Sequence, residues 1–347
     1  MKRCVAVCLA AVMLAGGAAA AIKKGPVKRP EAKASAVSRP SPKKAAPAAP
    51  KRPAAKPSVA KHAIAKPVAA KPQATNPYRR APYVGALALD ARTGRILFAD
   101  GADRPARPAS VTKLMTALLV LEDVKSGRYG LEAPVRAGPM ALLMEPSVIG
   151  FYDVKTKQPV TWSVDTLLYA LMIRSANDAT VALAEHSAGS LDAFVARMNA
   201  KAKALGMNST VYYNPNGLPP NAAKRYPWRS FNVTTCHDQA KLAREIVLHH
   251  PQLLTYTSKK TWTMPNGQTI INHNDVMRMD KWKIVNPDGT EAVDGLKTGY
   301  IDAGGSSVVL TGHRGRNRAI VVVLGSASAK LRDEHARSLM SDALSAL

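Results

Sequence analysis

The sequence predicts an α/β (α+β) fold in which both ends of the folded part complete one β-sheet and a helical subdomain is inserted between them. Strand-like runs rich in Val, Ile and Leu occur at residues 83–98 and again at residues 306–325. The stretch between these runs carries the apolar spacing of helices instead. Residues 81–347 are long enough to bury one hydrophobic core, so we expect a single domain there.

Residues 1–21 have the layout of a cleaved secretory signal peptide. Lys2 and Arg3 precede an apolar run, and small residues follow it up to Ala21. The apolar run is shorter than the roughly 20 residues that a membrane-spanning helix needs. We therefore expect secretion across the inner membrane to the periplasm or cell envelope. The alternative is an uncleaved signal that anchors the chain.

Residues 22–80 consist almost entirely of Lys, Pro, Ala and a few Ser. Between Ile22 and Arg80 there are 16 Lys or Arg residues against the single acid Glu31, so +15 of the formal net charge of +25 lies in this segment. Its apolar surface is too small to offset the entropy of ordering, which predicts a disordered tether. The expected partner is an anionic envelope polymer or membrane surface. Nucleic acid is not expected, because an export signal precedes the tether.

Only one cysteine remains once the signal has been removed. Cys4 and Cys8 lie inside the signal, which leaves Cys236. This residue opens an apolar helical pattern that continues to Val247. We interpret it as a packed thiol near a helix start rather than as a nucleophile.

The first elements of the folded part are a hairpin and a helix. Residues 83–89 and 95–98 are predicted to be its strands, and the turn between them contains Gly94, where a positive φ is expected. Pro108 and Ser110 then begin an apolar helix that ends near residue 127.

The remaining elements follow from the same rules. Helical spacing predicts two helices around the turn Ser175-Ala-Asn177 and one helix at the C-terminus, and β-rich runs predict two strands before that last helix. In chain order, the predicted ranges are 164–173 and 179–187 for the two helices, 306–311 and 319–325 for the strands, and about Arg332 to Leu347 for the last helix.

Ser110 and Lys113 form the first candidate catalytic pair. They stand three residues apart at the start of a predicted helix, which places the hydroxyl and the amine on one face within hydrogen-bond range. The helix N-terminus also favours a developing negative charge on oxygen. Lys113 can act as a base only if its pKa falls. Burial beside a second cation, for which Lys297 is the candidate, would lower it.

Ser175 and Asn177 lie on the turn between two predicted helices. Alternate residues of an extended turn project to one side, so Ser175 can relay a proton between Lys113 and a leaving amine, and Asn177 can hold a substrate amide. The alternative is a pair of helix-capping residues, because Ser and Asn are frequent caps.

Each short motif is weak evidence by itself. Lys125-Ser-Gly127 has the same pattern as Lys297-Thr298-Gly299, but it falls at a predicted helix C-terminus, where Lys and Gly are ordinary residues. The combination is more specific, because Ser110 opens a helix and Lys297 precedes a β-rich run. Together the motifs supply a hydroxyl nucleophile, a base, a relay and a second cation, which acyl transfer through a serine ester requires.

Four motifs give the chain a resemblance to a known family. They are Ser110-Val-Thr-Lys113, Ser175-Ala-Asn177, Asn214-Pro-Asn-Gly-Leu218 and Lys297-Thr-Gly-Tyr300. From about Tyr83 to the C-terminus the chain resembles the D-alanyl-D-alanine carboxypeptidases among the low-molecular-weight penicillin-binding proteins. The resemblance implies a serine β-lactamase or penicillin-binding-protein transpeptidase-like fold, with an antiparallel sheet flanked by helices. Residues 81–347 would then form a D,D-peptidase catalytic domain.

The resemblance also implies a role for each matched residue. Ser110 would be the acylated nucleophile, Lys113 the general base and Ser175 the proton relay. The backbone N–H groups of Ser110 and Tyr300 would form an oxyanion hole. The implied substrate-binding residues are Asn177, Lys297, Thr298, Gly299, Tyr300 and Arg332, although Arg332 could instead be a solvated helix residue.

The same resemblance implies the ligands. The expected substrate is the D-Ala-D-Ala end of peptidoglycan stem peptides, β-lactam antibiotics would be covalent inhibitors, and neither a cofactor nor a metal is expected. Two positions depart from the family pattern. Ile301 stands where Thr is common, which removes a hydroxyl from the pocket edge, and His273 stands where many relatives have Arg near the cleft.

Other functions are open or disfavoured. Relatives that act as D,D-endopeptidases on cross-links share the build expected here, a catalytic domain without the second β-rich domain of the larger family members. A catalytically idle cell-wall-binding module is the non-enzymatic alternative. A class A β-lactamase would need a Glu-x-x-Leu-Asn loop, which Glu145-Pro-Ser-Val does not match. A metallopeptidase would need His and carboxylate at ligand spacing, and the sequence has no His-Glu-x-x-His.

Overall fold

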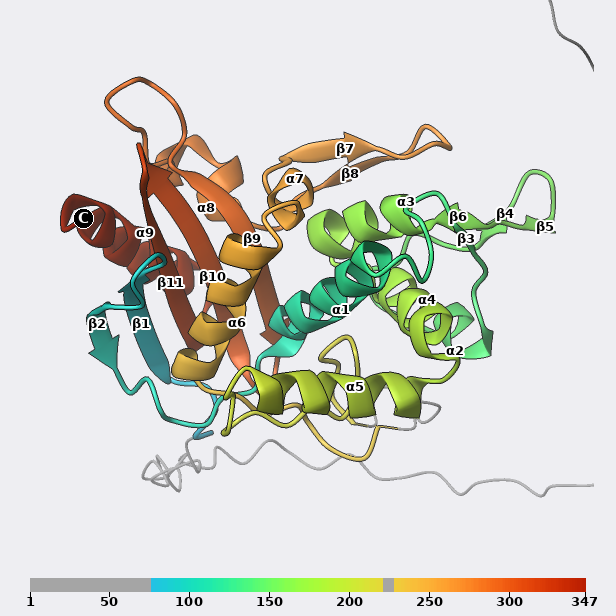
Figure 1. The fold of residues 1–347 in the computed structure, drawn as a ribbon, viewed down its shortest axis with the longest axis horizontal. Helices are drawn as coiled ribbons and strands as arrows, with labels where there is room; N and C mark the ends of the chain where they lie inside the picture. The colour runs from blue at the N-terminus through green and yellow to red at the C-terminus, as the bar shows by residue number, and fades with distance from the viewer. Residues whose placement is uncertain (1–75, 221–227) are drawn as a thin grey trace, which may run out of the picture. The chain divides into compact units, whose positions relative to one another are not determined.

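A computed structural model describes residues 76–220 and 228–347 (Figure 1). The predicted signal and most of the predicted tether lie outside the described residues. Residues 76–80, which we expected in the tether, are described and pack on the folded domain. Arg80 forms a β-bridge with Ser326, and the Arg79 guanidinium donates to the Ala327 carbonyl oxygen at 2.9 Å. The folded part therefore begins at least five residues before residue 81.

The core of the fold is one five-stranded antiparallel sheet with the strand order β2-β1-β11-β10-β9. The N-terminal hairpin joins the C-terminal strands because β1 pairs with β11 along its whole length. This confirms the prediction that both ends complete one sheet (Figure 1). The strands are β1 (Gly85–Asp90), β2 (Ile96–Asp100), β9 (Val293–Ile301), β10 (Gly305–Arg314) and β11 (Asn317–Ser326).

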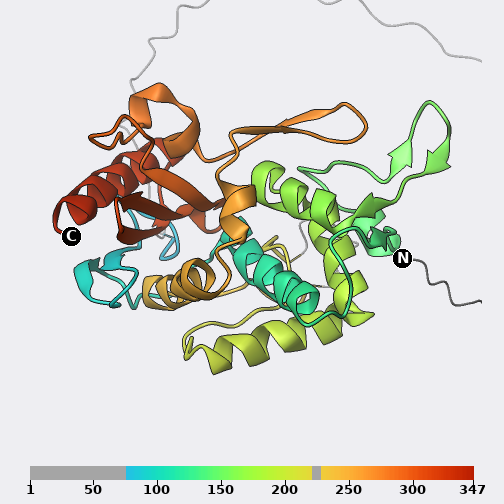
Figure 2. The same cartoon turned by 45° about the horizontal axis from the view of Figure 1, so that its top comes forward.

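Helices cover both faces of this sheet (Figures 1 and 2). Side chains alternate along each strand, so β1, β9, β10 and β11 each contribute to two separate apolar clusters. On one face Val321 and Val323 pack with Met340 of α9 (Ala329–Ser345). On the other face Val322 lies in one cluster with α1 (Lys113–Lys125) and α6 (Cys236–His249). No described helix is both long and apolar enough to cross a membrane.

The predicted helical subdomain is inserted between β2 and β9. Its first part contains α2 (Pro139–Leu142), α3 (Val164–Tyr169), a π-helical turn (Ala170–Arg174), α4 (Asn177–Ala188) and α5 (Leu191–Ala204). Short strands accompany them, namely β3 (Pro134–Val135), β4 (Tyr152–Asp153), β5 (Gln158–Pro159) and β6 (Trp162–Ser163). After α6 come α7 (Leu253–Thr257), the hairpin β7 (Thr261–Thr263) and β8 (Thr269–Ile271), α8 (Asp275–Arg278) and a 3-10 turn (Asp280–Trp282).

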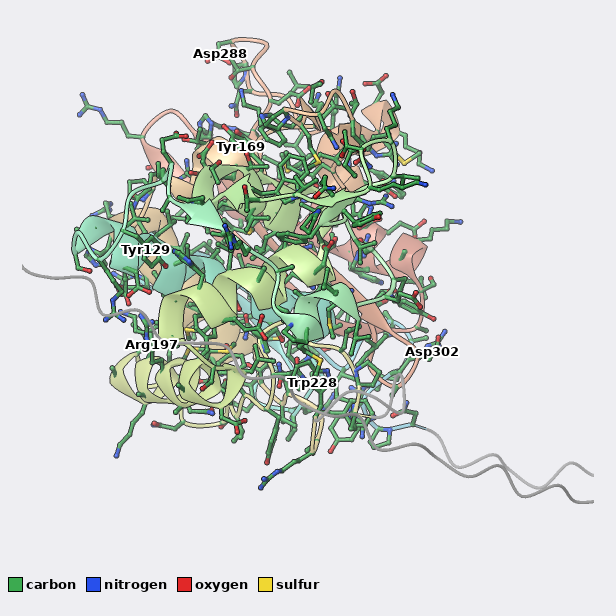
Figure 3. The ribbon with its side chains drawn as sticks, turned by 90° about the vertical axis from the view of Figure 1, so that its right-hand side faces the viewer. Tyr129, Tyr169, Arg197, Trp228, Asp288 and Asp302 are labelled. Carbon is green, nitrogen blue, oxygen red and sulfur yellow. The ribbon has the colours of Figure 1, made fainter. Side chains whose placement is uncertain are left out.

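A buried carboxylate joins α1 to the helices beside it. Asp123 accepts hydrogen bonds from Arg197 of α5 at 2.7 Å and from the Tyr129 hydroxyl at 3.2 Å. Figure 3 shows Tyr129 and Arg197 on the same side of the molecule. Because the carboxylate is nearly inaccessible to water, these charged bonds hold the end of α1 firmly in place.

The ends of two helices differ from the predictions. Ser110 lies in a 3-10 turn (Ala109–Thr112) that precedes α1, rather than in the α-helix itself. The last helix begins at Ala329 and not near Arg332, because the Ser328 side chain accepts a hydrogen bond from the Leu331 N–H and caps the helix there. The interpretation of Cys236 is confirmed: it is buried at the first turn of α6, and burial raises the pKa of its thiol.

Candidate active site

The hydroxyl of Ser110 and the amine of Lys113 meet at the start of α1. In a 3-10 turn, residues three apart lie almost directly above one another. The Lys113 Nζ atom therefore reaches to 2.9 Å from the Ser110 Oγ atom. Lys113 is completely buried, whereas Ser110 is partly open to solvent.

Two further oxygen atoms hold the Lys113 amine. The Asn177 Oδ1 atom lies 2.8 Å away and the Asn216 carbonyl oxygen 3.0 Å away. Both oxygens can only accept hydrogen bonds. A neutral amine has two N–H groups and one lone pair, so these two acceptors use both N–H groups. The lone pair then faces Ser110, which can donate its proton to it.

Burial makes the neutral form of Lys113 accessible. Burial lowers the pKa of Lys113 well below its usual value, and the positive charge of Lys297 lowers it further. The carboxylate of Asp178 acts in the opposite direction. Burial and then the charge of Arg332 lower the pKa of Lys297 to about 7.

The edge strand β9 lies directly against the Ser110 turn. A Cβ atom added at Gly299 would lie 2.6 Å from the Pro108 carbonyl oxygen and 2.9 Å from the Ser110 nitrogen, so only glycine fits. Lys297 is buried and donates to the Thr298 carbonyl oxygen at 3.0 Å. No described strand pairs with the outer side of β9, which leaves backbone groups available on that edge.

The Asn214–Leu218 loop closes the other side of the Ser110 turn. Gly217 has a φ of +80°, and an added Cβ would collide with the Ala109 carbonyl oxygen. The Asn214 side chain accepts from the Gly217 N–H at 2.6 Å and donates to the Leu218 carbonyl oxygen at 3.0 Å. The loop is thereby fixed so that the Asn216 carbonyl oxygen points at Lys113.

The Ser175–Asn177 turn presents its two polar side chains differently. Ser175 has a left-handed φ of 59°, lines the cleft, and its hydroxyl makes no hydrogen bond among the described residues. Asn177 uses both ends of its amide, because its Oδ1 atom accepts from Lys113 and its Nδ2 atom donates to the Pro146 carbonyl oxygen at 2.5 Å. In this state Asn177 orients Lys113 rather than offering a free amide to a substrate.

Asp178 fixes the loop that carries Pro146 to the same turn. Its buried carboxylate accepts from the backbone N–H groups of Ile149, at 3.0 Å, and Gly150, at 2.8 Å. The Ser147 hydroxyl of this loop donates to the Arg174 carbonyl oxygen at 2.7 Å. Neither Asp178 nor Asn216 was predicted to have a role, although Asp178 directly follows the Ser175-Ala-Asn177 motif and Asn216 lies within the Asn214-Pro-Asn-Gly-Leu218 motif.

One cleft joins most of the predicted site residues. Its lining residues are Ser110, Pro146, Ser147, Ser175, Asn177, Leu218, His273, Asp275, Thr298, Gly299, Tyr300, Ala329 and Arg332. Lys113 and Lys297 lie buried beneath this surface. Tyr300 is 54% exposed, and its hydroxyl donates to Asp302 at 2.5 Å.

The Arg332 guanidinium is held by the next residue in the chain. Its Nε atom donates to the Asp333 Oδ1 atom at 2.8 Å and one terminal nitrogen donates to Oδ2 at 3.0 Å. Both residues are buried. Arg332 is therefore a cleft residue with a fixed orientation, and the alternative of a solvated helix residue is wrong.

The two departures from the family pattern lie in different surroundings. His273 lines the cleft and is exposed at its surface; desolvation by the neighbouring protein lowers the pKa of its imidazole, and the charges of Lys297 and Arg174 contribute. Ile301 is buried and does not line the cleft, so its side chain packs instead of forming the pocket edge.

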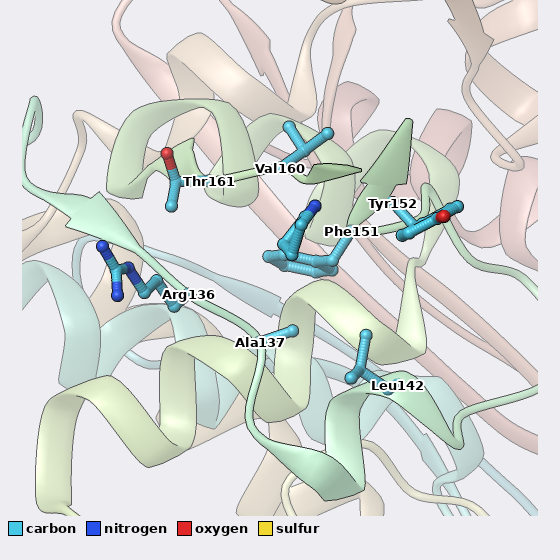
Figure 4. Close-up of a pocket in the computed structure, with 8 residues that line it drawn as sticks. Arg136, Ala137, Leu142, Phe151, Tyr152, Val160 and Thr161 are labelled. Carbon is cyan, nitrogen blue, oxygen red and sulfur yellow. The ribbon is translucent and has the colours of Figure 1, made fainter. Parts of the chain in front are cut away.

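Two other features of the described residues lie apart from these motifs. A pocket in the helical subdomain contains none of the predicted site residues (Figure 4); it is lined by Arg136, Ala137, Leu142, Phe151, Tyr152, Pro159, Val160 and Thr161. Glu122, Glu245 and His250 form a cluster of potential metal ligands near the opposite end of α1 from Lys113. Lys201 already supplies a positive charge to this cluster, with its Nζ atom 2.5 Å from Glu122.

The fold is similar to that of solved penicillin-binding proteins. Penicillin-binding protein D2 from Listeria monocytogenes, in an ampicillin-bound form, is 30% identical with a TM-score of 0.63, covering 76% of this chain and 97% of that one. Penicillin-binding protein 6B from Escherichia coli is 31% identical with a TM-score of 0.62, covering 81% of each chain. The fold and site together define a protein of the low-molecular-weight penicillin-binding class.

The family follows from the sequence comparisons. The family model for D-alanyl-D-alanine carboxypeptidases (peptidase family S11) matches residues 75–328, and the chain belongs to this family. A curated relative, D-alanyl-D-alanine carboxypeptidase DacD from Salmonella typhimurium, is 33% identical over 253 residues, which is 73% of this chain. The chain spans 60% of the length of that relative.

Proposed function

We propose that the protein is a serine-type D-Ala-D-Ala carboxypeptidase that removes the terminal D-Ala from peptidoglycan stem peptides. One observation carries the proposal: the buried Lys113 amine has the Ser110 hydroxyl and two pure acceptors as its hydrogen-bond partners. This arrangement prepares a lysine to take the proton of a serine nucleophile. Membership of the carboxypeptidase family supports the choice of substrate.

Acylation uses Ser110 and Lys113. The Ser110 oxygen attacks the carbonyl carbon of the peptide bond between the two D-Ala residues, and its proton passes to Lys113. The backbone N–H groups of Ser110 and Tyr300 stabilise the oxyanion that forms, a type of contact worth roughly 3–4 kcal/mol of transition-state binding. The C–N bond then breaks, and the leaving amine takes the proton from Lys113 through the free Ser175 hydroxyl.

Deacylation reverses the proton path. Water attacks the ester carbon and gives a proton to Lys113, the ester C–O bond breaks, and the proton returns to the Ser110 oxygen. The shortened stem peptide leaves with a new carboxylate. The enzyme ends in its starting state.

Basic and hydroxyl groups at the cleft suit the terminal carboxylate of the substrate. Thr298 and Arg332 line the cleft, and Lys297 lies beneath it. The Nη1 atom of Arg332 has no hydrogen bond among the described residues, which leaves it free to donate to a carboxylate oxygen. The same groups would bind the carboxylate of a β-lactam, which would acylate Ser110 as a covalent inhibitor.

The place of action is part of the proposal. The N-terminal sequence supports secretion across the inner membrane into the periplasm or cell envelope, where peptidoglycan lies. The excess of Lys and Arg in residues 22–80 supports weak binding of the chain to an anionic envelope polymer or membrane surface.

A D,D-endopeptidase is the second candidate. A curated relative named D-alanyl-D-alanine endopeptidase, from Escherichia coli, is 30% identical over 234 residues, which is 65% of this chain and 65% of that protein. Both reactions would use the same Ser110 ester, and they differ only in the amine that leaves. In a cross-linked dimer the same D-Ala carbonyl is bonded to a side-chain amine of a second stem peptide, so that amine would leave in place of free D-Ala.

Chromatography of digested peptidoglycan distinguishes these functions. The purified chain is incubated with cross-linked peptidoglycan and with free pentapeptide, beside a Ser110→Ala variant. Release of free D-Ala without loss of dimers supports the carboxypeptidase. Conversion of dimers into monomers supports the endopeptidase. If neither product forms and ampicillin does not label the chain, the protein is an idle wall-binding module.

A further inference from the structure

The guanidinium of Arg107 lies between two aromatic rings just before the Ser110 turn. Its central carbon is 4.2 Å from the centre of the Tyr78 ring and 3.7 Å from the centre of the Phe231 ring. Tyr78 comes from the segment before β1, and Phe231 from the segment before α6. Each cation–π contact contributes about 0.5–2 kcal/mol, so the side chain is held in one orientation.

This fixed guanidinium binds the turn between β9 and β10. Its Nη1 atom donates to the Ala303 carbonyl oxygen at 3.1 Å, and the Asn76 side chain donates to the same oxygen at 3.0 Å. The turn also packs closely against Arg107, because a Cβ atom added at Gly304 would lie only 2.8 Å from the Arg107 Cβ atom. The turn therefore has little freedom to move relative to Arg107.

The positions of these residues connect them to the site. Arg107 stands three residues before Ser110, and Ala303 three residues after Tyr300. Ser110 and Tyr300 carry the two backbone N–H groups that we assign to the oxyanion hole. The hydrogen bond between the Arg107 side chain and Ala303 therefore joins the segment that carries Ser110 to the segment that carries Tyr300. The separation of these two segments sets the distance between the two N–H donors.

We propose that Arg107 is a positioning residue that holds the oxyanion-hole donors of Ser110 and Tyr300 at their working separation, with Tyr78 fixing its guanidinium. The inference rests on the proposed acyl-transfer function. It also gives residues 76–80 a part in catalysis, because these residues supply both Tyr78 and Asn76 to the arrangement. The last residues of the segment predicted as a tether then support the active site.

The test compares full-length variants. Arg107→Met removes the charge and the hydrogen bond while keeping an apolar chain, and Arg107→Lys keeps the charge. Tyr78→Ala removes one ring and Tyr78→Phe retains it. Arg104→Met is the matched control, because Arg104 is on the same segment and its guanidinium approaches the Val84 carbonyl oxygen at 3.4 Å instead of the turn. The measurements are the ampicillin acylation rate constant at saturation, the non-covalent dissociation constant and the Tm.

Misplaced oxyanion-hole donors reduce the stabilisation of the transition state but do not weaken the initial non-covalent complex with ampicillin. Arg107→Met is expected to lower the saturating acylation rate constant roughly 10- to 100-fold while the non-covalent dissociation constant changes by less than about threefold. Arg107→Lys should recover part of the rate, and Tyr78→Phe should stay within about twofold of the wild type. Tyr78→Ala should lie between Tyr78→Phe and Arg107→Met. A purely structural effect would lower the Tm without this split between rate and affinity.

Two results overturn the inference. In the first, the wild type is acylated and Arg107→Met reacts as fast as Arg104→Met, so the role of Arg107 is refuted while the proposed function stands. In the second, ampicillin does not acylate the wild type at all. Then the proposed function fails and the role of Arg107 fails with it.

Discussion

The Nζ atom of Lys113 lies 2.9 Å from the Ser110 Oγ atom and is closed to water on every side. Its other two partners, on Asn177 and Asn216, can accept hydrogen bonds but cannot donate them. The direction of proton transfer is thereby decided by the surroundings of the amine. A neutral Lys113 can only receive a proton from Ser110.

Removing the second cation should change the pH dependence of acylation. The charge of Lys297 lowers the pKa of Lys113, so Lys297→Met is expected to raise that pKa. Lys113 acts as a base in its neutral form. The rising limb of the acylation rate against pH should therefore move to higher pH, which stopped-flow acylation by a chromogenic cephalosporin can measure. A limb that stays in place or moves to lower pH contradicts the electrostatic link.

A methyl group at Gly299 should separate β9 from the nucleophile. The added Cβ would meet backbone atoms of Pro108 and Ser110, which cannot rotate away. Gly299→Ala is expected to lower the acylation rate roughly 100-fold, as for a displacement of about 1 Å at a reacting group. Gly130→Ala is the control, because no atom lies within 4 Å of the position that its Cβ would occupy. Equal rates for both variants would show that the close approach has no catalytic value.

The pair formed by Arg332 and Asp333 allows stability to be separated from binding. Arg332→Gln leaves the buried Asp333 carboxylate without its partner, which is expected to cost about 3–5 kcal/mol of unfolding free energy. It should also raise KM for a carboxylate-terminated peptide roughly 10- to 100-fold through the loss of a charged hydrogen bond.

Adding Asp333→Asn removes the unpaired charge. The double variant should regain most of the stability in a denaturant titration and keep the high KM. Recovery of KM together with stability would mean that Arg332 acts only through folding.

The sequence predicted the fold because its signals are local. The hairpin at residues 83–98, the strands β10 and β11 and the middle helices each follow from short-range spacing or turn residues. The predicted start of α9 was too far along the sequence, because the apolar pattern does not reveal that Ser328 caps the helix. The packing of residues 76–80 was missed because Pro77, Arg79 and Arg80 continue the basic, Pro-rich composition of the residues before them.

The site was predictable in its residue types but not in its contacts. Spacing on one helix is enough to pair Ser110 with Lys113. The local sequence does not predict that the Asn216 carbonyl oxygen or the Asn177 amide contacts Lys113. Asn216 is 103 positions from Lys113 in the sequence, and Asn177 is 64 positions away. Arg107 gave no signal for the same reason, since Ala303 is 196 positions away.

The most direct measurement is the intact mass of the protein after incubation with ampicillin, followed by peptide mapping of the adduct. The account predicts one ampicillin equivalent per chain, attached to the peptide that contains Ser110, and no adduct on Ser110→Ala at the same Tm. An adduct that persists on Ser110→Ala, or a wild-type chain that gains no mass, would contradict the claim that Lys113 activates Ser110 for acyl transfer.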